Sequence, residues 1–369
     1  MELKISSLEL KRALRRTLGI VERKTTMPIL SNVLLEATRE HGLTVSAFDL
    51  EIGLVSRQRC EVIKDGTVAL PARHLHDIVN SLQEDSQLTL KRLPNGQVEI
   101  QSGSVRFKIV ASAADEFPAL PTAEGAVGME IPADILFLMI ERTAFAISTD
   151  ETRYNLGGVF LEKTDQGALR MVATDGHRLA LVDRPIAGDL KLEQGVLIPK
   201  KGLLELKRLL AEEGGACELG FTKGSAVFRR GEVVMVMRLL DGQFPDYRQV
   251  IPKESEKVVR LGRLRFIESL KRVSLVASDK TNGVRLEVSP GKLTLTSQNP
   301  DLGEAQEDLE ADVTGDALKV GFNARYLIDA LSVLSCDDVR LEIADELSPG
   351  VIRPVGEDGF LSVVMPMRI

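Results

Sequence analysis

The side chains best suited to chemistry in this sequence are Asp175 and His177, which stand two residues apart. A carboxylate beside an imidazole can work as a general acid–base pair, and the same two groups can ligate a metal ion. An enzyme hypothesis would make them part of a hydrolytic site. Such a site needs further groups, yet His41, His74 and His76 do not stand at metal-ligand spacing from His177. The sequence also has no phosphate-binding glycine loop and no nucleophile elbow, which counts against an enzyme.

The elements that position these two residues indicate a structural role instead of a catalytic one. The segment Met171–Asp183, MVATDGHRLALVD, predicts a strand, a tight turn and a second strand. Similar segments begin at Leu43, LTVSAFDLEIGLV, and at Leu293, LTLTSQNPDLGEAQE. The turn residues Asp49, Asp175 and Asn299 recur about 125 residues apart, which is a domain-sized period. His177 occurs in only one copy, so a catalytic role would have had to arise on a structural turn.

The flanking segments repeat with the same period. Upstream lie MPILSNVLLE at Met27, RYNLGGVFLE at Arg153 and TNGVRLEV at Thr281; downstream, Pro71, Pro199 and Asn323 each open an apolar helix; Phe117-Pro118, Phe244-Pro245 and Met365-Pro366 close the copies. We therefore expect an α+β chain of three tandem copies of a unit with two helices and an antiparallel sheet. The expected domains are residues 1–125, 126–250 and 251–369.

Capping and periodicity predict two helices in each copy. Ser6 and Glu9 form a capping-box pattern. The expected helices run from Ser6 to about Val21, Ala72 to Leu82, Pro132 through Ile147, near Pro199 to Leu210, about Leu261 to Ala277, and Ala324 to Leu334. Asn95-Gly96 predicts a hairpin turn, and Pro118 to Gly128 predicts a linker.

Composition limits the class of protein. The formal net charge of −7 argues at face value against a nucleic-acid partner, although a basic stripe on an acidic body still attracts phosphate locally. No apolar run approaches the roughly 20 residues of a membrane span. The N-terminus does not read as a signal peptide, and three cysteines are too few for a disulfide framework, so we expect a cytoplasmic protein.

Basic residues gather on the predicted helices of all three copies. They include Lys11, Arg12, Arg15 and Arg16 in the first copy, Lys200, Lys201, Lys207 and Arg208 in the second, and Arg263, Arg265, Lys271, Arg272 and Arg325 in the third. A single basic helix face is usually only solvated. The same bias on several equivalent helices favours a shared functional surface.

A string of three such units leaves an exposed strand at each end. One end is expected at Ser104–Val110 and the other near the acidic run Leu302–Glu310. Opposite charge favours head-to-tail pairing, and two chains can then close a six-unit ring under twofold symmetry. The residues expected at this dimer interface are Arg106, Phe107, Lys108 and Glu304.

Several motifs in order resemble the bacterial sliding clamp family, the beta subunits of DNA polymerase III. They are MPIL at Met27, PAR at Pro71, RY at Arg153, ATDGHRLA at Ala173, DGQFPDYR at Asp241 and VVMPMR at Val363, and the resemblance covers the whole chain. It implies a head-to-tail homodimeric ring around duplex DNA that tethers polymerases, with no catalytic residues, no metal and no cofactor. A separate loader would open the ring.

The resemblance also implies DNA contacts, transferred by motif position. They are Lys24, Arg73, Asp150, Arg153, Tyr154 and Asn155. Well-known members have an aromatic pair where this chain has Tyr154-Asn155 and an amide where it has Asp150, so we expect weaker base stacking here. Without the family, Tyr154 could be a strand residue covering the core.

The resemblance further implies a pocket for short peptide tails that end in Leu and Phe. Its residues would be Leu156, Thr174, Gly176, His177, Arg178, Leu179, Pro245, Val250, Val364, Met365, Pro366, Met367 and Arg368. The implied partners are the polymerase III catalytic subunit, the clamp loader, and other polymerases and repair proteins. Without the family, Met365 and Met367 would be core of a final strand, and a scaffold that binds peptides but no DNA remains an alternative.

Overall fold

The computed structural model describes residues 1–22, 26–186, 192, 194–212, 215–252, 255, 257–278 and 281–368. These residues form two compact units. The N-terminal unit consists mainly of Met1–Ala133 and Arg208–Leu239, and the C-terminal unit of Asp134–Ile186, Leu192–Lys207 and Leu240–Ile369. The middle copy of the repeat thus contributes to both units. We describe each unit by itself.

Two antiparallel sheets build the N-terminal unit. The larger has the order β10-β15-β16-β17-β4-β3-β2-β6, and the smaller has the order β5-β1-β7-β8-β9. Their strands are β1 Glu2–Ser6, β2 Asn32–Thr38, β3 Gly42–Phe48, β4 Ile52–Gln58, β5 Glu61–Lys64, β6 Gly66–Pro71, β7 Gln87–Arg92, β8 Gln97–Ser102, β9 Val105–Val110, β10 Val127–Ile131, β15 Cys217–Phe221, β16 Ser225–Arg230 and β17 Val233–Arg238.

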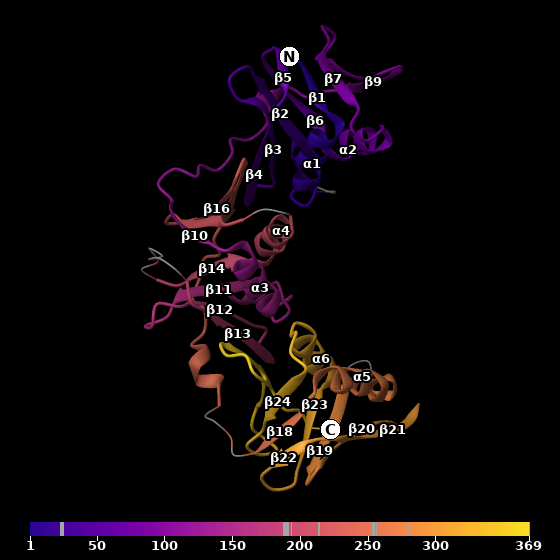
Figure 1. Ribbon diagram of the computed structural model, residues 1–369, viewed down its shortest axis with the longest axis vertical. Helices are drawn as coiled ribbons and strands as arrows, with labels where there is room; N and C mark the ends of the chain where they lie inside the picture. The colour runs from indigo at the N-terminus through magenta and orange to yellow at the C-terminus, as the bar shows by residue number, and fades with distance from the viewer. Residues whose placement is uncertain are drawn as a thin grey trace. The chain divides into compact units, whose positions relative to one another are not determined.

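Helices α1 (Ser7–Thr17) and α2 (Ala72–Ser81) pack side by side over the strands β4-β3-β2-β6 (Figure 1). The predicted cap is confirmed, because Ser6 Oγ accepts a hydrogen bond from the Leu8 amide at 3.2 Å. Leu10 and Leu14 are fully buried beneath α1. Removing such apolar side chains from water is the main force that holds a helix to a sheet.

The C-terminal unit has two further antiparallel sheets. Their orders are β14-β11-β12-β13-β26-β25-β24-β18-β22 and β21-β20-β19-β23. The strands are β11 Gly158–Lys163, β12 Leu169–Thr174, β13 Arg178–Arg184, β14 Val196–Pro199, β18 Val258–Gly262, β19 Gly283–Ser289, β20 Lys292–Asn299, β21 Gly303–Glu310, β22 Asp312–Thr314, β23 Leu318–Asn323, β24 Asp338–Glu342, β25 Gly350–Pro354 and β26 Phe360–Val364.

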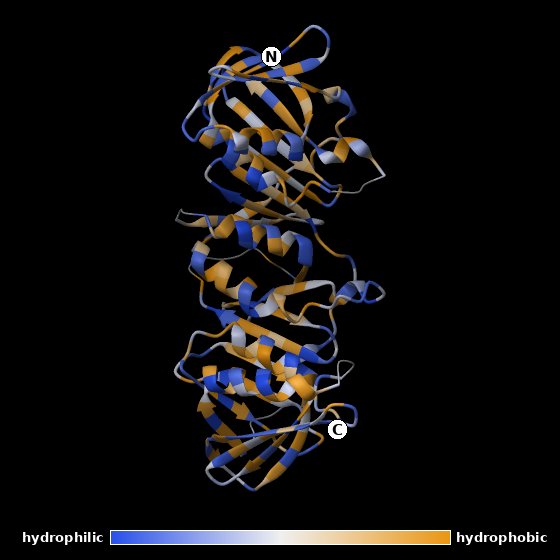
Figure 2. Cartoon of the chain, turned by 90° about the vertical axis from the view of Figure 1, so that its right-hand side faces the viewer, coloured by the Kyte–Doolittle hydropathy of each residue, from blue (hydrophilic) through white to orange (hydrophobic). Residues whose placement is uncertain are grey.

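Four helices and several short 3-10 turns complete the described chain. The helices are α3 Ala133–Ala144, α4 Lys200–Leu210, α5 Arg263–Val273 and α6 Ala324–Ser332; the 3-10 turns are Pro28–Ser31, Ala114–Glu116, Tyr154–Leu156, Tyr247–Val250 and Ser274–Val276. α5 and α6 pack side by side against β20, β21 and β23. Figure 2 shows hydrophilic and hydrophobic residues alternating along the helices, as amphipathic helices on a sheet require. No helix among the described residues is long and apolar enough to cross a membrane.

Several predicted boundaries are wrong by a few residues. α1 ends at Thr17 instead of Val21, α3 at Ala144, and α5 at Val273, where a 3-10 turn follows. Gly128 is not in a linker, because it pairs with Gly220 within β10 and β15. Helix ends are set by tertiary contacts and caps, which local propensity does not encode.

The predicted recurring turn is confirmed at all three positions. Asp49 accepts bonds from the Glu51 and Ile52 amides, Asp175 from the His177 and Arg178 amides, and Asn299 from the Asp301 amide. Each side chain closes the turn between two antiparallel strands. A short polar side chain that accepts from the following amides stabilises such a turn locally.

The strand pairing between copies also recurs. In the N-terminal unit, β17 of the second copy pairs with β4 of the first, Met237 lying opposite Ile52. In the C-terminal unit, β26 of the third copy pairs with β13 of the second, Val364 lying opposite Arg178. The strands in the equivalent places at the two remaining sheet ends are β9 and β21.

Candidate functional site

The turn that carries Asp175 and His177 is rigid and uses its own polar groups. Thr174 Oγ1 donates to the Arg178 carbonyl at 2.7 Å and accepts from the Gly176 amide at 3.1 Å. Gly176 has φ +88°, a left-handed conformation that favours glycine. A Cβ there would also lie 2.9 Å from Arg153 Nη1. The Asp175 carboxylate is therefore occupied in holding the turn.

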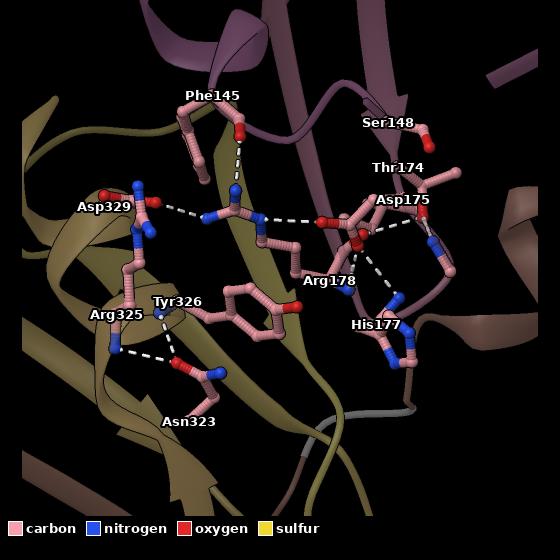
Figure 3. A network of polar contacts seen from close by, with 12 residues as sticks. Phe145, Ser148, Thr174, Asp175, His177, Arg178, Asn323, Arg325, Tyr326 and Asp329 are labelled. Carbon is pink, nitrogen blue, oxygen red and sulfur yellow. Dashed lines mark hydrogen bonds and ion pairs between the residues drawn. The ribbon is translucent and has the colours of Figure 1, made fainter. Parts of the chain in front are cut away.

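Arg178 joins this turn to the end of α3 and to α6 (Figure 3). Its guanidinium donates to Asp175 Oδ2 at 3.1 Å, to Asp329 Oδ2 at 2.6 Å and to the Phe145 carbonyl at 2.7 Å. It also lies over the Tyr326 ring, 4.5 Å from the centroid. The Arg178 side chain is only 11% exposed, so the turn is fixed from several sides.

His177 lies beside Tyr326 and faces a polar cleft. Its ring lies near the Tyr326 ring, with the centroids 6.4 Å apart and the planes 21° from parallel (Figure 3). It lines a polar cleft of about 660 Å³ together with Arg153, Lys200 and Arg325. The described residues hold no group of three or more His, Cys, Asp or Glu that could bind a metal ion.

An apolar pocket of about 180 Å³ lies beside the same turn. Eight of the residues expected for a peptide pocket line it, namely Leu156, Thr174, Gly176, Arg178, Leu179, Pro245, Val250 and Met365. Its floor is continuous with a buried core cluster that includes Val172, Leu181 and Phe244. A concave apolar surface with a few polar groups at its edge is typical of a ligand site.

Five other residues expected in the pocket do not line it. His177 lies in the polar cleft. Val364 is fully buried on β26 opposite Arg178, and its neighbour Val363 lines the pocket instead. Pro366, Met367 and Arg368 follow β26, and the Met367 amide donates to the Gly321 carbonyl at 2.8 Å. Met365 is 40% exposed and lies after the strand, so it is not core of the final strand.

Sequence reasoning missed three pocket residues, Val363, Asp246 and Tyr247. Strand alternation was the available signal for Val363, because neighbours on a strand face opposite sides. Tyr247 belongs to the DGQFPDYR motif but had been assigned no role. Its hydroxyl donates to Glu162 and accepts from Arg170 Nη1 at 3.0 Å. Burial raises the pKa of Tyr247, so this hydroxyl stays protonated as a donor.

The loop expected to meet DNA holds an exposed aromatic ring. Tyr154 is 62% exposed on a 3-10 turn and its ring lies against Gly242, so it does not cover the core as a strand residue. The Asn155 side-chain amide donates to the Gln243 carbonyl at 3.2 Å. Asp150 Oδ1 accepts from the Thr152 hydroxyl at 2.6 Å, and the bonds from Thr152 lower the pKa of Asp150. Arg153 Nε lies 3.6 Å from Asp150 Oδ2, so the two side chains form an ion pair.

The remaining expected DNA residues are described only in part. Lys24 lies outside the described residues. Arg73 is half-buried near the start of α2. The basic residues Arg12 and Arg15 on α1 are exposed, as are Arg265, Lys271 and Arg272 on α5.

The residues expected at a dimer interface lie on the two sheet ends. Arg106, Phe107 and Lys108 are on β9, the last strand of its sheet, and Glu304 is on β21, the last strand of another. Val110, the last residue of β9, is 71% exposed, and Leu302, just before β21, is 67% exposed. Exposed aliphatic residues on an unpaired strand edge are typical of an interaction surface.

Known proteins match this chain along its full length. Three family models match in order: the DNA polymerase III beta subunit N-terminal domain at residues 1–121, its central domain at 130–246 and its C-terminal domain at 248–368. The beta sliding clamps of Pseudomonas aeruginosa and Pseudomonas putida are 36% and 35% identical to it, and each comparison covers all of both chains.

Solved structures match as closely. A Pseudomonas aeruginosa sliding clamp bound to griselimycin has a TM-score of 0.95 and 34% identity over all of both chains. A Caulobacter crescentus beta sliding clamp, with polyethylene glycol bound to its putative beta-motif tethering region, has a TM-score of 0.95 and 34% identity. That comparison covers all of this chain and 99% of the other.

Proposed function

The chain belongs to the DNA polymerase III beta subunit family, the beta sliding clamps, and from that premise we propose that two copies close head to tail around duplex DNA. A sliding clamp is a processivity factor without catalysis. It keeps polymerases on the template by enclosing the duplex, so affinity comes from topology more than from contact energy. Sequence-independent contacts to phosphate suffice for that task.

The observation that carries ring closure is the strand order of the four sheets. Joined at β9 and β21, the two smaller sheets would read β5-β1-β7-β8-β9-β21-β20-β19-β23. The nine-stranded sheet of the C-terminal unit already has that pattern, because β26 of the third copy follows β13 of the second. The two smaller sheets are thus complementary parts of one nine-stranded sheet. A second copy of the chain supplies the missing part.

Register supports the same proposal. In each repeat, one backbone amide beyond the last strand donates to the strand that precedes the second helix. The donors are Ser112, Leu240 and Met367, and the acceptors are the carbonyls of Ala69, Leu197 and Gly321 respectively. This equivalence transfers the register of the two internal strand pairs to β9 and β21. It sets Lys108 of one copy opposite Glu304 of the second, and Val110 opposite Leu302. Opposite charges and the two exposed aliphatic residues then meet across the interface.

The test of ring closure is the solution mass by light scattering, paired with electron-microscope images. We expect a dimer with a central hole wider than a duplex. Phe107→Asp should yield monomers, because it places a charge on the core side of the shared sheet. Val127→Asp, a change at an exposed residue on another edge strand, is the matched control and should stay dimeric. A wild-type monomer would contradict the proposal.

We propose that the DNA contacts come from Lys24, Arg73, Arg153, Tyr154 and Asn155 and from exposed basic residues of the helices. Asp150 would act by shaping the loop, because its carboxylate is anionic and repels phosphate. Tyr154 offers one ring for stacking. DNA affinity should fall steeply with salt, since phosphate contacts release counterions.

We propose that the apolar pocket binds short tails of partner proteins that end in Leu and Phe. The expected partners are the polymerase III catalytic subunit, the clamp loader, and other polymerases and repair proteins. Burying two such side chains contributes roughly 3 to 6 kcal/mol before ordering losses. Weak binding of this size lets partners exchange, and the exposed Met365 suits a pocket that accepts several ligands.

The alternative function is a scaffold that binds peptides but no DNA. Fluorescence anisotropy separates the two, using a labelled duplex and a labelled Leu-Phe peptide between 50 and 500 mM salt, roughly the range over which phosphate contacts are screened. For a clamp, DNA affinity should fall by orders of magnitude while peptide affinity changes little. DNA affinity that does not change with salt, or no measurable DNA binding at all, would favour the scaffold. Because chromosomal DNA lies in the bacterial cytoplasm, the proposed function places the protein there. Enclosing DNA and binding peptide tails require no cofactor.

A further inference from the structure

The first helix of each repeat carries an arginine as its tenth residue. These residues are Arg16 on α1, Arg142 on α3 and Arg272 on α5. α1 packs against β4 and α5 against β21, the strands that end at a junction with another repeat. Two of these junctions lie within the chain, and the third is the head-to-tail contact of the proposed function, on which this inference rests.

At the first junction, Arg16 crosses to the second repeat. Its guanidinium donates to Glu212 Oε2 through Nη2 at 2.6 Å and through Nε at 2.9 Å. The two side chains are 14% and 19% exposed. Glu212 follows α4 and stands as far beyond Pro199 as Glu84 stands beyond Pro71. A partly buried paired arginine of this kind joins the same two repeats as the β17–β4 strand pair.

At the second junction, Arg142 crosses to the third repeat. It pairs with Glu357 in the turn between β25 and β26, where Nη2 lies 2.7 Å from Oε2. Arg142 is 1% exposed, so breaking this pair would leave a buried charge. Both internal junctions therefore use the same arginine position and a glutamate from the following repeat.

At the third position, Arg272 stays within its own repeat. It donates to Glu307 on β21, through Nη2 at 2.7 Å and through Nε at 3.0 Å. Ser269 Oγ donates to the same carboxylate at 2.7 Å. The Arg272 side chain is 54% exposed and Glu307 is 24% exposed.

The strand residue in the place of Glu307 differs at the first junction. There Ser56 of β4 faces the arginine, and Arg16 Nη1 donates to Ser56 Oγ at 3.0 Å. A serine leaves the cation free to pair across the junction. The third junction differs in having a carboxylate on the strand itself, so its arginine is neutralised before any second copy arrives.

We propose that in the head-to-tail dimer Arg272 of one copy pairs with Glu84 of the second copy, and that Glu307 holds Arg272 while the junction is open. Glu84 is the first repeat's equivalent of Glu212. Its side chain is 81% exposed, and among the residues that the structure describes its one ionic contact is a distant one, 3.8 Å from Lys11 Nζ to Glu84 Oε1. The alternative carboxylate, the equivalent of Glu357, is missing, because the turn between β8 and β9 consists of Gly103 and Ser104.

This arrangement makes the intermolecular junction the least costly one to open. Separating either internal junction would take the carboxylate from Arg16 or Arg142 and leave an unpaired guanidinium. At the third junction Glu307 takes over as Glu84 leaves, so no charge is left unpaired. A ring with two such junctions can open for loading without disrupting the chain's internal contacts.

The test is a double-mutant cycle on the dimer dissociation constant, measured by sedimentation or mass photometry on the full chain. Arg272→Ala and Glu84→Ala should each weaken dimerisation on the order of tenfold, and the double variant should be no weaker than the worse single one. Lys223→Ala, at an exposed lysine in the turn between β15 and β16, is the control and should leave the constant unchanged. Additive losses, or no loss with Glu84→Ala, would overturn the pair.

Glu307→Ser provides the second measurement, because it copies Ser56. We expect tighter dimerisation and slower exchange of labelled subunits, since the open form then lacks a partner for Arg272. A Glu307 that only supported the fold would give the opposite result, and weaker dimerisation would overturn its holding role. If the wild-type chain were monomeric at all concentrations, the head-to-tail dimer itself would fail. That outcome is distinct from a dimer without Arg272–Glu84 coupling.

Discussion

Arg178 on β13 and Asp329 on α6 are 151 positions apart in sequence, yet Arg178 Nη1 donates a hydrogen bond to Asp329 Oδ2 at 2.6 Å. Because Arg178 also lines the apolar pocket, this bond ties the pocket wall to a helix of the third repeat. Asp329 does not line that pocket. Its influence on a bound peptide would therefore act through the position of Arg178.

Asp329→Ala should weaken peptide binding by about tenfold, since a hydrogen bond between charged groups contributes about 1.5 kcal/mol or more. Fluorescence anisotropy with a labelled Leu-Phe peptide measures this. Asp329→Asn, which keeps an acceptor, should recover part of the affinity. Asp316→Ala, at an exposed carboxylate in a turn, serves as the control. Equal affinity in all variants would show that Asp329 has no positioning role.

Gly176→Ala should disturb the pocket more than an ordinary glycine change. Its φ of +88° is unfavourable for alanine, by about 1 kcal/mol, and the new Cβ would contact Arg153 Nη1. We expect a lower thermal midpoint and weaker peptide binding. Gly167→Ala isolates the conformational part, because Gly167 has φ +82° and open space around its missing Cβ. Identical peptide affinity in both variants would mean that the Arg153 contact is irrelevant.

Glu357→Gln should lower stability at pH 7 by about 2 kcal/mol, because it leaves Arg142 buried without a counter-charge. The hydrogen bond from Arg142 lowers the pKa of Glu357. The carboxylate therefore contributes stability above its unfolded pKa of about 4.3, and this contribution is lost as pH falls through the lower folded pKa. Thermal midpoints should thus differ most at pH 7 and converge in acid. Glu346→Gln, on an exposed turn, should match wild type throughout.

Lys271→Ala should reduce the slope of log DNA affinity against log salt by about one, if Lys271 meets a single phosphate. The measurement is anisotropy of a labelled duplex over a salt series. Lys223→Ala, at an exposed hairpin lysine of the second repeat, is the matched control. A slope that changes equally in both variants would indicate general charge attraction without a defined helical surface.

The threefold repeat and the turn side chains were predictable because their signals are local. Asp49, Asp175 and Asn299 each bond to amides within three positions, so the sequence around them carries the whole pattern. Eight pocket residues followed from motifs. The motif indicates Val364, whereas Val363 faces the pocket, because a motif does not say which side of a strand is buried.

The ion pairs between repeats could not be predicted. Arg142 and Glu357 are 215 positions apart, and nothing near either residue indicates its partner. Arg142 stands within the predicted helix from Pro132 through Ile147, and its neighbours in the sequence do not indicate that it is buried. Only the folded chain shows that it is almost fully buried. Long-range pairing of this kind depends on sheet register, which is a property of the assembled fold.

The strand pair β17–β4 has the same construction as the pair beside the pocket, but Gly53 stands where Leu179 lines the cavity. A Cβ on Gly53 would lie 2.7 Å from Pro121 Cδ and 3.7 Å from Leu120 Cδ2. The connecting segment that contains Leu120 and Pro121 therefore occupies the space that a bound peptide would need. Under the proposed function, partner proteins that share the Leu-Phe tail would compete for the one such pocket among the described residues of each chain, and their relative concentrations would set which of them is bound. A closed ring of two copies would then bind at most two partner proteins through this pocket, one on each copy.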